Sequence, residues 1–408
     1  MDPLRNPFTP NAGARPSVLI GRDEQLRSFE LLLARLAAGR TEQSMIITGL
    51  RGVGKTVLLG QFRTMALKQG WAVVEWEVSK HEDDHFRRQL ALQFRTALLT
   101  LSPRAKWKAR AKRAAAVLRS FTITTDPSGN VAASIDLGEL PALGIADSGD
   151  LGTDLTSLVV ALGEAAKECG KGVVILLDEV QFLSKPQLEA LIASLHRSVQ
   201  LELPLTMAAA GLPQIAQLAG EAKSYAERLF RFPTIGILSA TEAEATLKES
   251  ARQEGADFAS DAVTLAQRRT GNYPYFLQEL GYSVWPIAEG PVITRSDVEV
   301  ALPAYLSKLD SSFFRVRLDR ATELETAYLR AMAELGPHPQ SAADVARLLN
   351  RTSQQCGPTR SGLIVKGLLY TPSHGLAAFT VPQFDLFLKR VIPRLTVPAI
   401  KPRRRRGH

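Results

Sequence analysis

Short apolar runs alternate with helical periodicities along the first 238 residues. Each run is rich in aliphatic residues and lies between turn signals, which is typical of a buried strand. The predicted strands are residues 45–48, 71–78, 173–177, 203–210 and 232–238. Before and between them, apolar residues recur at three- and four-residue spacing, as in residues 21–36, which predicts amphipathic helices. This alternation predicts an α/β fold around a doubly wound parallel sheet.

Two further segments belong to this region. Residues 1–16 hold four prolines and two asparagines and are predicted to form an extended arm before a core at 17–238. A long insert, at about residues 95–155, separates the second and third strands. It contains a cationic helix and then residues 121–137, where alternating apolar residues flank Pro127-Ser128-Gly129-Asn130 and predict a hairpin.

The pattern after residue 238 is mainly helical. Helix starts are predicted at Ser239 and Thr294, because an acid follows each hydroxyl residue three positions later. We expect a helical lid at 239–318, a third unit at 319–395 and a basic tail at 396–408.

The third unit is predicted to be a winged helix-turn-helix. Helices at 323–335, 345–349 and 353–366 precede a hairpin around Pro372-Ser373-His374-Gly375. Cys356-Gly357-Pro358 is a poor helix interior, so Pro358 is an alternative start of the third helix. In this motif the third helix enters the DNA major groove.

Composition excludes several protein classes. Of the 408 residues, 45% are hydrophobic and 22% are charged, an ordinary globular balance. Cys169 and Cys356 are too few for a disulfide framework or a zinc site, and the six histidines show no triad or metal-ligand spacing. No signal peptide is evident, and no apolar run approaches the roughly 20 residues that span a bilayer. We therefore expect a cytoplasmic protein without a membrane partner.

Positive charge is concentrated in two segments. There are 50 Lys and Arg against 41 Asp and Glu, a net charge of +9, and the last eight residues carry five cations and no acid. A second run holds seven cations between residues 104 and 119 with no acid among them. Such runs attract phosphate backbones, although a solvated helix face and a solubilising tail explain them equally well.

One motif is specific enough to predict chemistry. Residues 49–56 read GLRGVGKT, which fits G-x-x-x-x-G-K-[ST], and they lie between a predicted strand and a predicted helix as the motif requires. Its glycines let main-chain N–H groups point at phosphate oxygens, and the following helix N-terminus adds a positive dipole. Lys55 is expected to contact the β- and γ-phosphates, and Thr56 to ligate Mg²⁺. The expected nucleotide-binding residues are Gly49, Leu50, Arg51, Gly52, Val53, Gly54, Lys55, Thr56 and Val57.

A second signal follows the third strand. That strand delivers Asp178 and Glu179 to the carboxyl edge of the sheet, where ligands bind in open α/β folds. Asp178 is expected to hold Mg²⁺, and Glu179 to act as the general base for an attacking water. Gln181 is either a residue that places this water or senses the γ-phosphate, or a residue of a surface turn.

These two motifs resemble the Walker A and Walker B motifs of P-loop ATPases. With the five-strand core, the lid and the winged-helix pattern, the chain is similar over about residues 17–390 to AAA+ ATPases of the origin-recognition-complex-like group, and to the related STAND signalling ATPases. The insert is not part of their usual core. The resemblance implies ATP and Mg²⁺ as cofactors. It also implies that Ile20, Gly21 and Arg22, within the segment VLIGRDE, pack on adenine.

The chain also departs from this family pattern. The fourth strand of such ATPases usually ends with a polar sensor, whereas residues 207–211 read MAAAG. An arginine acting on a neighbouring subunit is expected before the fifth strand, where Arg228 and Arg231 are candidates, although each also suits a surface or structural role. Gly271-Asn272-Tyr273-Pro274 is similar to the Gly-x-Pro motif of STAND proteins, which implies a nucleotide contact for Pro274. The departures predict slow hydrolysis.

Three hypotheses remain open. The first is an ATPase switch whose winged helix binds double-stranded DNA. The second is a DNA-binding regulator that holds ATP without hydrolysing it, and the third is a signalling ATPase whose winged helix makes protein contacts only. A homo-oligomer or another protein partner stays open in each case. A kinase is less expected, because nothing suggests a phosphoacceptor pocket. The candidate DNA-contacting residues are Gln354, Gln355, Thr359, Arg360 and Lys366.

Overall fold

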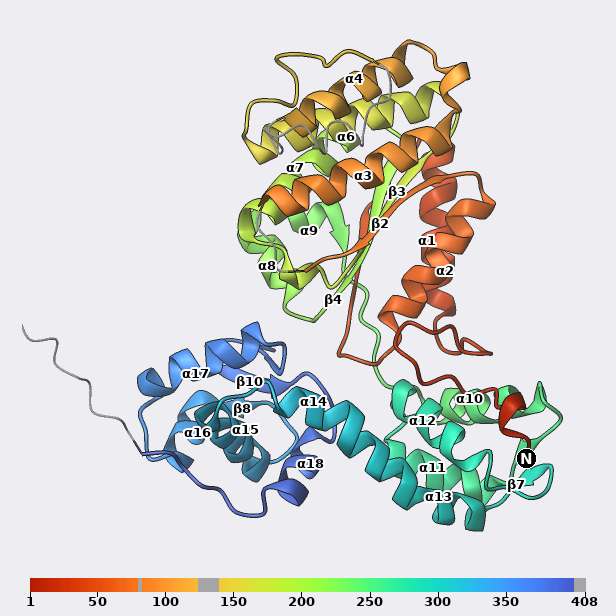
Figure 1. Ribbon diagram of the computed structural model, residues 1–408, viewed down its shortest axis with the longest axis vertical. Helices are drawn as coiled ribbons and strands as arrows, with labels where there is room; N and C mark the ends of the chain where they lie inside the picture. Colours follow the sequence, from red (N-terminus) through yellow and green to blue (C-terminus); the bar gives the residue numbers. More distant parts are fainter. Residues whose placement is uncertain (80–82, 124–138, 400–408) are drawn as a thin grey trace, which may run out of the picture. The chain divides into compact units, whose positions relative to one another are not determined.

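The computed structural model describes residues 1–79, 83–123 and 139–399 (Figure 1). The chain divides into two compact units. The core unit comprises residues 11–49 and 53–243, and the C-terminal unit comprises residues 1–10, 50–52 and 244–408. Among the described residues, no helix is both long and apolar enough to cross a lipid bilayer.

A five-stranded parallel sheet in the order β2-β3-β4-β1-β5 forms the centre of the core unit. Its strands are β1 (Ser44–Thr48), β2 (Ala72–Glu77), β3 (Val173–Asp178), β4 (Leu205–Gly211) and β5 (Phe230–Arg231). Strands β1 and β4 are buried along their whole length, and β3 is buried up to its last residue. Such burial on both faces is why their sequences are continuous apolar runs. The predicted α/β fold with a doubly wound parallel sheet is confirmed.

The predicted fifth strand at 232–238 is wrong. Phe230 and Arg231 pair with the start of β1, and after them only Thr234 adds a bridge, to Thr48, among the described residues. The apolar run that follows β5 therefore continues as a connector. An edge strand needs one hydrogen-bonded neighbour, so its position is set by pairing with β1 more than by its own sequence.

Helices cover both faces of this sheet (Figure 1). They are α1 (Asp23–Ala37), α2 (Lys55–Lys68), α3 (Asp83–Leu101), α4 (Ala109–Ile123), α6 (Leu151–Glu168), α7 (Lys185–Gln200), α8 (Ile215–Ala222) and α9 (Ala226–Leu229), with 3₁₀ turns η2 (Arg104–Lys106) and η3 (Val180–Phe182). Helix α1 packs on α2 through the stacked rings of Phe29 and Phe62, whose centroids lie 4.1 Å apart.

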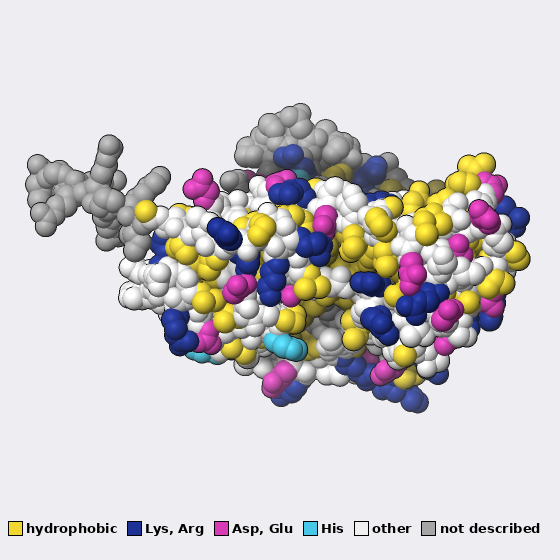
Figure 2. All heavy atoms as spheres, turned by 90° about the horizontal axis from the view of Figure 1, so that it is seen from below, with side chains coloured by type: hydrophobic (Ala, Val, Ile, Leu, Met, Phe, Trp, Pro, Cys, Tyr) yellow, Lys and Arg dark blue, Asp and Glu magenta, His cyan; other side chains and the backbone are white. Residues whose placement is uncertain are grey.

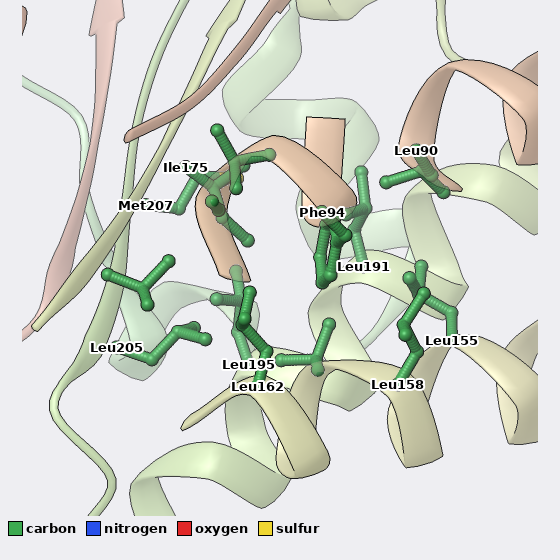
Figure 3. Packing of buried hydrophobic residues seen from close by; sticks show 14 of the residues in the cluster. Leu90, Phe94, Leu155, Leu158, Leu162, Ile175, Leu191, Leu195, Leu205 and Met207 are labelled. Carbon is green, nitrogen blue, oxygen red and sulfur yellow. The ribbon is translucent and has the colours of Figure 1, made fainter. Parts of the chain in front are cut away.

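The insert extends the core by a helical layer. Phe94 of α3, Leu158 of α6 and Leu191 of α7 belong to one apolar cluster with strands β3 and β4 (Figure 3). Trp107 anchors the cationic run to this layer, because its ring is buried and its indole N–H donates to the Ser102 carbonyl at 2.8 Å. Residues 121–123, predicted to begin a hairpin, instead end α4, and residues 124–138 lie outside the described residues.

The first part of the C-terminal unit is helical, as predicted for the lid. Its elements are α10 (Ala240–Arg252, which begins in the core unit), β6 (Asp257–Phe258), α11 (Ser260–Thr270), α12 (Pro274–Val284), β7 (Val292–Ile293), α13 (Arg295–Lys308), the π-helical η4 (Leu309–Phe314) and α14 (Arg315–Leu318). Ser239 and Thr294 cap α10 and α13 as predicted. The two-residue strands β6 and β7 pair with each other and were not predicted.

The N-terminal residues are held by this unit. A 3₁₀ turn, η1 (Pro3–Arg5), is followed by Phe8, which is 1% exposed. The Phe8 ring packs edge-on against Phe258 and Trp285, with centroids 6.2 and 6.4 Å away. The indole N–H of Trp285 donates to the Asp2 carbonyl at 2.9 Å. The first ten residues thus pack on the helices of this unit, and apart from η1 they form neither helix nor strand.

The last part of this unit contains the helices and hairpin predicted for residues 323–381. The elements are α15 (Glu323–Leu335), β8 (Gln340–Ser341), α16 (Ala342–Leu348), α17 (Ser353–Val365), β9 (Leu369–Tyr370), β10 (Leu376–Phe379) and α18 (Phe384–Val391), with an antiparallel sheet in the order β8-β10-β9. The alternative start of α17 at Pro358 is wrong. Thr352 and Gln355 form a capping box that starts the helix at Ser353, and Pro358 lies inside it.

Candidate nucleotide-binding site

The predicted phosphate loop joins β1 to α2, at the carboxyl edge of the central strands. Gly52 and Gly54 have φ angles of 86° and 94°, in the left-handed region that favours glycine. A side chain at Gly49 would be excluded, because its Cβ would lie 2.4 Å from the Ile235 carbonyl oxygen. The glycines of the motif therefore meet backbone requirements of this loop.

Lys55 carries its charge inside the loop. Its side chain is 6% exposed, and Nζ donates to the Gly49 carbonyl oxygen at 2.9 Å. A buried ammonium group needs anionic or strongly polar partners to offset its desolvation. Phosphate oxygens would supply such partners, so the position of Lys55 fits an anionic ligand.

Thr56 and Asp178 are brought together from 122 residues apart. The Thr56 hydroxyl donates to Oδ2 of Asp178 at 2.5 Å, and Oδ1 accepts the Glu179 N–H at 2.8 Å. Burial raises the pKa of Asp178, against the opposing effects of these two hydrogen bonds and of Lys55. A hydroxyl and a carboxylate are hard oxygen donors of the kind that Mg²⁺ prefers.

The donor set is small, which also fits Mg²⁺. The described part of the chain contains no cluster of three or more His, Cys, Asp or Glu side chains that could hold a metal alone. Magnesium in nucleotide sites commonly takes one or two protein ligands and completes its shell with phosphates and water. Thr56 and Asp178 therefore suit the predicted ion.

Glu179 adopts an uncommon backbone conformation. Its φ of 54° is left-handed, which is rare for a residue with a side chain and is found most often at functional sites. Its carboxylate accepts a hydrogen bond from the Gln181 side-chain amide. Gln181 is thus more than a residue of a surface turn, a distinction that its sequence position alone left open.

Comparison with known proteins agrees with this geometry. Residues 18–208 match the AAA ATPase domain family. The match implies nucleotide binding, and it contains the phosphate loop, Asp178 and Glu179. Residues 311–388 match a domain of unknown function. No curated protein matches the chain.

Solved structures support the fold. The Walker-type ATPase of Pyrococcus abyssi aligns with a TM-score of 0.57 at 15% identity, covering 92% of this chain and 97% of that one. Two others align more weakly. Cdc6p of Pyrobaculum aerophilum gives a TM-score of 0.46 at 13% identity, covering 96% and 98% of the two chains. Orc1 of Aeropyrum pernix, solved with DNA, gives 0.44 at 16%, covering 92% and 94%. At these scores the last two add nothing to the fold assignment.

Arg22 contacts the main chain of the phosphate loop. Its guanidinium is buried and donates to the carbonyl oxygens of Gly21 at 2.7 Å, Val53 at 3.0 Å and Gly236 at 3.1 Å. Burial lowers the pKa of Arg22, while the charge of Glu242 raises it. These hydrogen bonds orient the Arg22 guanidinium toward main-chain carbonyl oxygens. The adenine contacts implied for Ile20, Gly21 and Arg22 stay predictions.

Gly21 is required by close packing. Its φ is 71°, and a Cβ would lie 2.6 Å from Oε1 of Glu242, near the start of α10. Glu242 accepts the Ser239 N–H at 2.7 Å, so Gly21 and Arg22 together join the phosphate loop to the connector that follows β5. The sequence motif shows Gly-Arg but not the neighbours Gly236 and Glu242, which are more than 200 residues away.

The tip of the phosphate loop, residues 50–52, packs within the C-terminal unit. The Arg51 N–H donates to the Thr380 carbonyl at 3.2 Å, and the Tyr275 N–H donates to the Gly52 carbonyl at 3.2 Å. The Tyr273 hydroxyl donates to the Arg51 carbonyl oxygen. Pro274, the residue between these tyrosines, starts α12 beside the tip. Sequence reasoning did not foresee the tie to Thr380.

The two candidate arginines have different surroundings. Arg231 donates to Glu42 at 2.7 Å and to Gln43 at 3.2 Å, so its guanidinium is engaged within the chain. The Arg228 side chain is exposed and has no partner among the described residues. If an arginine acts on a neighbouring subunit, Arg228 is the better placed of the two.

Two cations predicted to contact DNA are used inside the C-terminal unit. Arg360 donates to the Leu376 carbonyl at 2.6 Å and to Thr371 at 3.2 Å. Lys366 forms an ion pair of 2.5 Å with Glu325. These contacts argue against phosphate binding by either residue. The remaining candidates on α17 are uncharged: Gln354, Gln355 and Thr359.

Proposed function

We propose that this chain binds Mg·ATP in its AAA ATPase domain, hydrolyses it slowly to ADP and phosphate, and uses the nucleotide state to control a C-terminal winged helix at residues 319–395. The observation that carries the proposal is the meeting of Lys55, Thr56, Asp178 and Glu179 where β1 and β3 end. This arrangement joins a cation for phosphates, oxygen ligands for Mg²⁺ and a carboxylate base.

The residues have distinct roles in the proposed reaction. Main-chain N–H groups of the loop and Lys55 bind the β- and γ-phosphates. Mg²⁺ held by Thr56 and Asp178 would neutralise phosphate charge. Glu179 accepts a proton from water as the water oxygen bonds to the γ-phosphorus and the bond to the β–γ bridging oxygen breaks. ADP leaves with its new charge next to Lys55.

Slow turnover is expected for two reasons. The end of β4 reads Ala208-Ala209-Ala210-Gly211 and offers no polar side chain to the γ-phosphate. Charge stabilisation by a second arginine would have to come from Arg228 of a neighbouring copy, and such arginines contribute about 10³–10⁵-fold in related chemistry. Without a neighbouring copy, the site is expected to bind ATP but to lose most of its rate of hydrolysis.

The loop tip supports coupling to the winged helix. The Arg51 N–H is bonded to Thr380, at the end of the β9–β10 hairpin, and the Gly52 carbonyl is bonded to Tyr275 at the start of α12. A ligand that changes the conformation of the loop must change these bonds or bind against them. Nucleotide can shift the position of the winged helix only by this kind of differential affinity.

The test is binding and turnover measured together. Wild type should bind fluorescent ATP with Mg²⁺ and release phosphate over repeated turnovers. Lys55→Ala should lose binding, and Glu179→Gln should bind as wild type does but release no phosphate. The proposal fails if wild type does not bind adenine nucleotides, or if Lys55→Ala keeps full activity. Tight binding without any turnover in wild type would favour the non-hydrolysing regulator.

A second candidate function, DNA binding by the core unit, is favoured by the cationic run. The side chains of Lys106, Lys108 and Lys112 are exposed and have no partners among the described residues, whereas Arg110 pairs with Glu164 at 2.6 Å. The exposed face of α17 carries no charge, and the face drawn in Figure 2 mixes cations with anions. Phosphate contacts are therefore proposed for the insert, and protein contacts for the winged helix.

A further inference from the structure

The Gln181 side chain connects two strand ends of the core unit. Gln181 lies in η3, directly after β3, and its Oε1 accepts the Leu212 N–H at 3.0 Å just beyond β4. Its Nε2 donates to a carboxylate oxygen of Glu179. A single amide thus spans from the end of β4 to the residue proposed as the general base.

The Leu212 N–H fixes which way this amide faces. A main-chain N–H can only donate, so it must meet the oxygen of the amide, and the NH₂ group then points to Glu179. That orientation suits a carboxylate, which accepts hydrogen bonds and donates none while it is ionised. Both hydrogen bonds therefore require the same orientation of the amide, with its oxygen toward Leu212 and its NH₂ group toward Glu179.

The strand end is shaped to admit this side chain. A Cβ at Gly211 would lie 2.9 Å from Oε1 of Gln181 and 2.9 Å from Cγ2 of Val180. Val180 is buried, which anchors η3 between the two bonded ends. Because residues 208–211 bring no polar side chain of their own, Gln181 supplies a polar group at this point of the site.

We infer that Gln181 is a positioning residue for hydrolysis: it holds the Glu179 carboxylate in the orientation from which it accepts the proton of the attacking water. The inference rests on the proposed function. A neutral amide is suited to this task, because it orients the base by hydrogen bonding without competing for the proton. General bases contribute about 10²–10⁴-fold, and a base held in the wrong orientation forfeits part of that.

The test compares two substitutions with a matched control. Gln181→Met removes both hydrogen bonds, whereas Gln181→Glu keeps an oxygen for Leu212 and replaces the donor to Glu179 with an anion. Gln217→Met is the control, because Gln217 is exposed on α8 and its side chain donates to Glu221 at 2.7 Å rather than to Glu179. The measurements are kcat and KM for Mg·ATP and the Kd for Mg·ADP.

We expect kcat to fall at least about tenfold in both Gln181 variants, with KM and the Kd for Mg·ADP within about twofold of wild type. Gln217→Met should match wild type throughout. The inference is overturned if either Gln181 variant keeps wild-type kcat, or if the loss is in nucleotide affinity instead. Should Gln181→Met not fold, Gln181→Glu decides, since it retains the Leu212 anchor. Failure of the proposed function is distinct: there wild type itself would not turn over, or Glu179→Gln would turn over normally.

Discussion

The guanidinium of Arg22 lies 3.0 Å from the main-chain oxygen of Val53, so the start of α1 is hydrogen-bonded to the phosphate loop. The same nitrogen reaches the Gly236 carbonyl, which ties the loop to the connector after β5. Arg22, which the family resemblance places against adenine, therefore also holds the loop that contains Val53. This arrangement makes a direct prediction about nucleotide affinity.

Replacing Arg22 with Lys should weaken Mg·ADP binding about tenfold, because a single ammonium group does not reproduce the planar fork that meets the Gly21, Val53 and Gly236 oxygens. Arg27→Lys is the matched control, since Arg27 is exposed on the same helix and donates to the Asp23 carbonyl. Isothermal titration well below the unfolding temperature measures the effect. Equal affinities in the two variants would contradict a role for Arg22 in shaping the loop.

Asp178→Asn should stabilise the nucleotide-free protein while removing Mg²⁺-dependent ADP binding. Burial raises the pKa of Asp178 above its ordinary 3.8, so the native state holds this proton more tightly than the unfolded state does. Stability is then lost as pH rises from the unfolded value through the native pKa. Asparagine is neutral and avoids that loss.

We expect the melting midpoint of Asp178→Asn to exceed that of wild type by about 2–4 °C at pH 7. The difference should shrink as the pH falls through the native pKa of the wild-type carboxyl, because the proton then removes the charge. Thermal unfolding at several pH values without nucleotide checks this, and titration with Mg·ADP checks the loss of binding. A variant that melts below wild type at pH 7 would show that the carboxylate is stabilising.

Arg87→Met should destabilise the core unit by about 3–5 kcal/mol, the usual cost of leaving one partner of a buried ion pair alone. Arg87 of α3 donates to Asp154 of α6 at 2.9 Å, and their side chains are 5% and 0% exposed. Arg63→Met is the control, because the Arg63–Glu75 pair is exposed and should contribute less than about 1 kcal/mol. Urea unfolding curves measure both, and similar effects would mean that the hydrogen bonds Asp154 already accepts from Ser148 and Gly149 suffice to stabilise its charge.

Local patterns predicted where the elements around the candidate site lie. The phosphate loop can be predicted because Gly52 and Gly54 meet local backbone requirements, as their positive φ angles show, whereas the limit on a side chain at Gly49 is set by the distant Ile235. Strand β3 can be predicted from the sequence because a strand that is covered on both faces must be apolar throughout. Asp178 and Thr56 then meet through the topology of a parallel sheet, which brings the ends of β1 and β3 to one edge.

Long-range partners explain what the sequence could not predict. Arg360 and Lys366 resemble DNA-contacting cations, yet their partners Leu376 and Glu325 lie on other elements. Gln181 depends on Leu212, and a local pattern gives no sign of that bond. The only local signal was the lack of a polar residue at the end of β4, which indicated that another side chain supplies the polar group there. Pro358 was misjudged for a local reason, because the capping box at Thr352 outweighs the loss of one N–H inside α17.

The salt dependence of DNA binding distinguishes the insert from α17 as the DNA-contacting surface. Each lysine that contacts a DNA phosphate releases counterions on binding. In a plot of the logarithm of the association constant against the logarithm of the salt concentration, every such contact should therefore add about 0.9 to the downward slope. Lys108→Gln should lower that slope by about 1, because Lys108 is exposed and unpaired among the described residues. Fluorescence anisotropy with duplex DNA between about 50 and 200 mM salt gives the slope.

Two controls decide what a change in slope means. Lys68→Gln removes an equally exposed charge from α2 and should leave the slope unchanged, so it tests whether net charge alone matters. Gln354→Ala alters the exposed face of α17 and should also leave DNA affinity unchanged. Weaker binding by Gln354→Ala with no effect of Lys108→Gln would assign DNA contact to the winged helix and reverse the proposal. A side chain without charge releases no counterions, so weaker DNA binding by Gln354→Ala would leave the salt slope unaltered. It would indicate that Gln354 contacts a base or a sugar.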